Sequence, residues 1–110
     1  MSYKITQQGS YAIVSLDGEV DLDTSPVARK QILDQLGEGR HVLVDLSAVE
    51  YIDSSGMASL VEAYKVAKDG KQKFGLVKVS RPAMQVLHLA KLDEVFPLYE
   101  SASECIDGKS

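Results

Sequence analysis

The N-terminal part of the chain alternates apolar and polar residues, which is the period of a β-strand with one buried face. Residues 3–6 follow this pattern, and residues 12–16 repeat it after the turn-forming sequence Gln8-Gly9-Ser10. We expect these two segments to pair as an antiparallel hairpin. The acidic residues 17–23 that come next are expected to form a connection.

Three later segments carry apolar residues at the spacing of an amphipathic α-helix. The first helix is expected to begin at Thr24-Ser25-Pro26, where a capping residue precedes proline, and to end at about Leu36. The second is expected to begin within Asp53–Ser55, to run to about Lys68 and to be closed by Asp69-Gly70. The third begins with the same cap-and-proline signal at Ser80-Arg81-Pro82.

Short apolar runs separate these helices. His41–Leu46 is almost continuously apolar and rich in β-branched residues, which predicts a strand covered on both faces. Residues 74–79 predict another strand, and residues 95–99 predict a short edge strand because Pro97 cannot donate to a ladder. A last helical turn is expected near residues 104–106.

The order of these elements predicts the fold class. Strands alternating with helices imply parallel crossover connections, so we expect an α/β fold with a mixed sheet of four or five strands and about four helices. With 110 residues the chain is long enough for one core of its own. We therefore expect a single domain that spans residues 1–110.

Composition narrows the function classes. Twelve Lys and Arg against sixteen Asp and Glu leave a net charge of −4, which disfavours nucleic acid as a partner. No apolar run has the roughly 18 residues that a membrane span requires. One cysteine and two histidines provide neither an internal disulfide nor a metal-ligand set of recognisable spacing. We expect a soluble cytoplasmic protein with no membrane partner, no metal and no cofactor.

The candidate chemistry lies at the start of the second helix. Ser54 and Ser55 fall in its first turn, where unpaired amides and the helix dipole tolerate a phosphate. Gly56 would let a partner approach the backbone closely, and Met57 belongs either to the core or to an exposed apolar patch. The simpler alternative is that Ser54 or Ser55 only caps the helix.

Enzymatic motifs are missing from the sequence. No G-x-S-x-G elbow surrounds Ser54, and no phosphate-binding glycine motif follows a strand. The acidic residues Asp17, Glu19, Asp21 and Asp23 lack the glycine and terminal glutamate of a calcium-binding loop. We therefore expect no catalytic residues, and an enzyme that uses Ser54 or the acidic residues is the weakest of the hypotheses.

The segment from Val44 to Gly56, VDLSAVEYIDSSG, resembles the signature of the STAS domain, in particular that of bacterial anti-sigma factor antagonists. Gly18-Glu19-Val20-Asp21 and Ser25-Pro26-Val27 resemble the family's second-strand exit and first helix, and Leu92 to Ser101 resembles its C-terminal end. The chain departs from the family in having Met57-Ala58 where Leu-Gly is frequent, and Ala90-Lys91 where Thr-Gly is common. The resemblance implies a STAS-type fold.

The resemblance also implies a phosphorylation-controlled partner switch. Ser54 would be phosphorylated by a GHKL-type serine kinase that is also the anti-sigma factor. The unphosphorylated protein would bind this kinase and release the sigma factor, and a PP2C-type phosphatase would reset the switch. Asp53 would orient the acceptor or meet the kinase, Ser55 and Gly56 would shape the helix start, and Gly18, Glu19 and Asp21 would form the neighbouring contact loop.

The same family resemblance is also consistent with an alternative function. The chain would then be a STAS scaffold or regulatory subunit of another assembly, such as a stressosome-like particle, a secretion-control system or a lipid-transport complex. Binding that does not depend on Ser54 would favour this alternative.

Overall fold

The computed structural model describes residues 2–107 and contains a five-stranded sheet with helices on both faces. Its elements, in chain order, are β1 (Lys4–Gln8), β2 (Tyr11–Val20), α1 (Ser25–Gly37), β3 (His41–Ile52), α2 (Ser54–Asp69), β4 (Phe74–Val77), α3 (Arg81–Leu89), β5 (Leu98–Tyr99) and α4 (Ala102–Ile106). The predicted order of strands and helices is confirmed.

The strands lie in the sheet in the order in which they occur in the chain, β1-β2-β3-β4-β5. β1 and β2 form the predicted antiparallel hairpin, and the other three neighbouring pairs are parallel. The sheet is therefore mixed, and the predicted α/β class is confirmed. No helix within residues 2–107 is long and apolar enough to cross a membrane.

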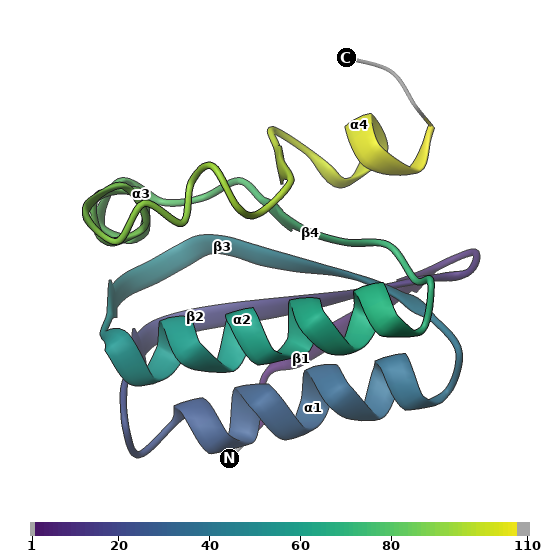
Figure 1. Cartoon of the computed structure of the whole chain (residues 1–110), viewed down its shortest axis with the longest axis horizontal. Helices are drawn as coiled ribbons and strands as arrows, with labels where there is room; N and C mark the ends of the chain where they lie inside the picture. Colours follow the sequence, from purple (N-terminus) through teal and green to yellow (C-terminus); the bar gives the residue numbers. More distant parts are fainter. Residues whose placement is uncertain (1, 108–110) are drawn as a thin grey trace.

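Alternating side chains of the central strands divide the core into two layers. Val14, Val44 and Leu76 belong to the larger cluster, which they share with apolar residues of α1, α2 and α3. Ile13 and Leu43 point to the opposite face, where α4 covers them. Figure 1 shows α1 and α2 side by side along the sheet. Strand β3 is covered on both faces, as its apolar sequence predicts.

Two strands are longer than predicted. The acidic connection expected at residues 17–23 is wrong for residues 17–20, because β2 continues to Val20 and pairs with an extension of β3 that ends at Ile52. The register shifts twice along this extension, and Gly18 has a φ of +63°. Such bulges break the period-two pattern by which a strand is identified in a sequence.

Three helices end in the same way. In each, the residue two positions after the last helical one has a left-handed backbone, with φ of +85° at Gly39, +57° at Lys71 and +59° at Lys91. For α3, the amide of Lys91 donates to the carbonyl of His88 and the amide of Leu92 donates to that of Leu87. This is the Schellman arrangement, in which glycine is the favoured residue. Gly70, expected to close α2, has an ordinary φ of −88°, so Lys71 takes the left-handed position.

Lys91→Gly is expected to stabilise the protein by about 0.5–1 kcal/mol, because glycine adopts the left-handed conformation without the Cβ clash that lysine incurs. Lys71→Gly should have a similar effect. Chemical denaturation of the variants measures the change. Gly39→Lys is the matched control and should lower stability by a similar amount, and a loss of stability in Lys91→Gly would contradict the explanation.

Candidate functional site

Helix α2 begins with an aspartate cap. Asp53 has an extended backbone, and its carboxylate accepts hydrogen bonds from the amides of Ser55 at 2.9 Å and Gly56 at 3.1 Å. These bonds satisfy two of the amides that have no partner inside the helix. The predicted start within Asp53–Ser55 is confirmed. The simpler expectation that a serine caps the helix is wrong, because the aspartate occupies the cap position.

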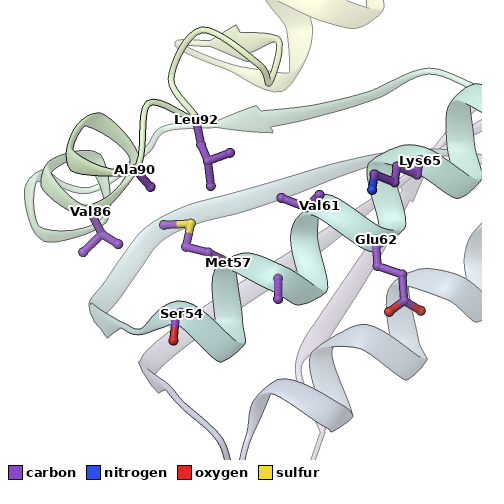
Figure 2. A pocket seen from close by; sticks show the side chains of 9 residues that line it. Ser54, Met57, Val61, Glu62, Lys65, Val86, Ala90 and Leu92 are labelled. Atoms are coloured by element: carbon purple, nitrogen blue, oxygen red, sulfur yellow. The ribbon is translucent and has the colours of Figure 1, made fainter.

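Ser54 is the first residue of α2 and is exposed to solvent. Within residues 2–107 its hydroxyl has no hydrogen-bond partner, and in Figure 2 its oxygen points away from Met57. Ser55 is half-buried, and its carbonyl accepts a bond from the Ser59 hydroxyl at 3.1 Å. Of the two adjacent serines, Ser54 is therefore the more exposed to solvent.

Gly56 packs inside the molecule. A Cβ atom at this position would lie 2.6 Å from Cγ1 of Ile52 and 2.9 Å from the carbonyl oxygen of Val20. The expectation that Gly56 lets a partner approach the backbone is therefore wrong, because β2 and β3 occupy the space next to this glycine. The glycine shapes the helix start by letting α2 approach both strands. Met57, at 4% exposure, belongs to the core.

The segment between β2 and α1 lies next to the start of α2. The amide of Asp53 donates to the carbonyl of Val20 at 3.1 Å, so Asp21 follows directly on a residue that is bonded to the α2 cap. Oδ1 of Asp21 accepts from the amides of Asp23 at 3.0 Å and Thr24 at 3.1 Å, and Thr24 donates its hydroxyl to the carbonyl of Glu19. The Asp21 carboxylate therefore holds the turn together.

The structure brings most of the predicted contact residues to one place. Glu19 pairs with Tyr51 and Val20 with Ile52, which puts Glu19 and Asp21 at the end of the sheet from which α2 starts. Gly18 pairs with Val49 and lies farther from Ser54 along the strand. Within residues 2–107, no three histidine, cysteine or acidic side chains gather in a way that would hold a metal ion.

A groove of about 620 Å³ runs between α2 and α3, with Ser54 among the residues that line it. Figure 2 shows Ser54 and Lys65 well apart along α2, with Val86, Ala90 and Leu92 across the groove. Its lining is mostly apolar: Met57, Ala58, Val61, Val86, Ala90 and Leu92. Sequence reasoning considered an exposed apolar patch at Met57, but it did not predict that α3 forms the other wall of a groove.

One charged residue of the groove is paired and another is not. Glu62 accepts hydrogen bonds from Arg29 of α1, with the Nε and Nη2 atoms of the guanidinium 2.7 Å and 2.6 Å from the same carboxylate oxygen. This hydrogen bonding lowers the pKa of Glu62 below its ordinary value. Within residues 2–107, Lys65 has no carboxylate at salt-bridge distance, and it is exposed.

The surroundings of Ser54 differ from those of a catalytic serine. A serine nucleophile requires a hydrogen-bonded base, and within residues 2–107 no side chain makes that bond to Ser54. The site instead combines an exposed hydroxyl, a fixed helix start, an acidic turn and an apolar groove. These features are suited to recognition by another protein.

Comparison with known proteins identifies relatives along nearly the whole chain. The family model of the STAS domain matches residues 2–105. The anti-sigma-F factor antagonist RsfB of Mycobacterium tuberculosis is 30% identical over 106 residues, which cover 94% of this chain and 85% of the relative.

Solved structures share the fold. An anti-sigma factor antagonist from Mycobacterium paratuberculosis is 27% identical and superposes with a TM-score of 0.83, covering 97% of this chain and 92% of that one. The Bacillus cell fate determinant SpoIIAA in its phosphorylated form superposes with a TM-score of 0.75 at 16% identity, covering 99% and 100% of the two chains. At that identity the second comparison shows the fold alone.

Proposed function

The chain belongs to the STAS domain family of bacterial anti-sigma factor antagonists, and on that basis we propose that it is a partner switch controlled by phosphorylation of Ser54. Its family is regulatory rather than catalytic. The unphosphorylated protein binds an anti-sigma factor that is also a GHKL-type serine kinase, and this binding releases the sigma factor. Phosphorylation of Ser54 weakens the complex, and a PP2C-type phosphatase restores it.

The exposure of Ser54 at the start of α2 is the observation that carries this proposal. A kinase must reach the acceptor hydroxyl, and the neighbouring serine, Ser55, is half-buried in the first turn. The STAS fold also accommodates a phosphate in SpoIIAA, which has been solved in its phosphorylated form. Together these observations favour Ser54 as the acceptor.

The charges around Ser54 explain how a phosphate would switch binding. It adds about −1.5 to −2 charges at neutral pH. The amides of Ser55 and Gly56 would otherwise attract an anion, but the Asp53 carboxylate already accepts their hydrogen bonds. The phosphate would therefore remain on the surface, beside Asp53 and the acidic turn at Asp21 and Asp23. A partner that docks on the unmodified surface would meet a concentrated negative charge.

The proposed contact residues have different roles. Asp53 fixes the helix start and places the acceptor, while Ser55 and Gly56 shape that start from within the molecule. Glu19 and Asp21 form the adjoining surface. Gly18 acts indirectly, because the bulge at Gly18 lets β2 extend to that surface. Met57 belongs to the core and contributes only indirectly, as part of the buried floor of the apolar groove beside Ser54.

Phosphate mapping tests the proposal. The protein is incubated with ATP and purified anti-sigma factor kinases of its source organism, and the modified residue is identified by mass spectrometry. We expect one phosphate, on Ser54, that a PP2C-type phosphatase removes. Ser54→Ala should abolish it, whereas the matched variant Ser55→Ala should keep it. Modification only at another residue, or none with any of the kinases, would refute the acceptor assignment.

A further inference from the structure

The groove between α2 and α3 has the properties of a site for an amphipathic small molecule. Its volume of about 620 Å³ lies within the range of roughly 300–1,000 Å³ typical of ligand pockets, and its walls are predominantly apolar. Met57 and Val61 line it from α2, and Val86 and Leu92 line it from the side of α3.

The charges at the groove indicate what kind of head group the ligand carries. Glu62 is engaged by Arg29, so its charge is already compensated. Lys65 also lines the groove, and among the described residues no carboxylate lies within salt-bridge distance of it. Among the described residues that line the groove, the one uncompensated charge is therefore positive, which favours an anionic head group.

The length of the groove also indicates how long the apolar part of the ligand is. From Ser54 to Lys65 the helix advances 11 residues, or about 16 Å at about 1.5 Å per residue. An extended alkyl chain of about a dozen carbons matches this length. We propose that the groove binds a medium- to long-chain monocarboxylate, with its carboxylate at Lys65 and its chain lying along Met57 and Val61 toward Ser54. This binding does not depend on phosphorylation of Ser54.

Titration with dodecanoate, below the concentration at which it forms micelles, tests this proposal in the absence of any kinase. Amide chemical shifts should change saturably, with the largest changes at Val61, Val86 and Leu92. Dodecanol has the same alkyl chain without the charge and should bind about fivefold more weakly. This is the largest change in affinity that the loss of one exposed ion pair usually causes. Absence of saturable shift changes with dodecanoate would overturn the proposal.

Charge reversal tests the assignment of the head group. Lys65→Glu should weaken dodecanoate binding by about tenfold and should make dodecylamine the tighter ligand. Lys68→Glu is the matched control, because Lys68 lies on the same helix, is exposed and does not line the groove. Equal losses in both variants, or no loss in Lys65→Glu, would overturn the assignment.

A substitution that fills the groove tests where the alkyl chain of the ligand binds. Val86→Trp should abolish binding by occupying the groove, and circular dichroism checks that this variant remains folded. Undiminished binding to folded Val86→Trp would place the ligand elsewhere and overturn the proposal. If that variant fails to fold, the Lys65→Glu and Lys68→Glu pair still decides, since both residues are exposed.

Discussion

Ser54→Asp is expected to weaken binding to the anti-sigma factor kinase by about tenfold, and phosphorylation of Ser54 by about a hundredfold. Aspartate adds one negative charge, whereas phosphate adds about −1.5 to −2, so the two effects should fall in this order. Ser54→Ala should bind about as tightly as the unmodified protein, because the hydroxyl of Ser54 has no hydrogen-bond partner within residues 2–107 that its loss would disturb.

Isothermal titration calorimetry with the purified kinase measures these affinities. Gln7→Glu is a suitable control, since Gln7 is an exposed residue of the edge strand β1 and the substitution adds a negative charge remote from α2. It should leave the affinity unchanged. Equal affinities of Ser54→Ala and Ser54→Asp would contradict the electrostatic mechanism.

The switch should also be local. The Asp53 cap already satisfies the amides of Ser55 and Gly56, so a phosphate on Ser54 has no need to rearrange the first turn of α2. Backbone amide spectra of the two forms should therefore differ only around Ser54 and the adjoining acidic turn. Widespread changes across the sheet would indicate a conformational mechanism instead.

Gly56→Ala is expected to lower the free energy of unfolding by about 2 kcal/mol. The added methyl group would lie 2.6 Å from the Ile52 side chain and 2.9 Å from the Val20 carbonyl, and the carbonyl belongs to the backbone of a paired strand. Overpacking of this kind costs about 1–3 kcal/mol, and the backbone on one side limits relaxation. The melting temperature should fall by roughly 10 °C.

Gly37→Ala provides the matched comparison. Gly37 also lies in a helix, but a Cβ atom there meets nothing within 4 Å. Alanine should therefore stabilise the protein by up to about 1 kcal/mol, through its better helix propensity. Thermal and urea denaturation of both variants distinguish the effect of steric overpacking from the effect of helix propensity on stability. A Gly56→Ala variant at least as stable as the original protein would show that α2 can move away from β2 and β3.

The start of α2 was largely predictable because its signals are local. The spacing of Met57, Leu60, Val61 and Tyr64 predicts the helix, and the polar run before it predicts the start within three residues. Which residue caps the helix was harder to predict from the sequence, since Asp53, Ser54 and Ser55 are all good capping residues. Backbone geometry decides among them, because Asp53 is the residue that remains extended at the end of β3.

The extension of β2 and the groove were not predictable in the same way. Residues 17–20 read as an acidic connection, since the bulges around Gly18 remove the alternation that identifies a strand. The groove depends on how α2 and α3 pack, and these helices are separated in the chain by β4. Its walls come from Met57 and Val61 on one side and from Val86 and Leu92 on the other.

The backbone bond between Asp53 and Val20 has a consequence for how Ser54 is recognised. It joins the last residue of β2 to the residue that follows β3, more than thirty residues later in the chain, and these two strands pair in parallel. Under the proposed function, the kinase would therefore meet a three-dimensional epitope, of which a linear stretch around Ser54 contains only a part. A synthetic peptide copied from residues 48–60 lacks the β2 half of this epitope.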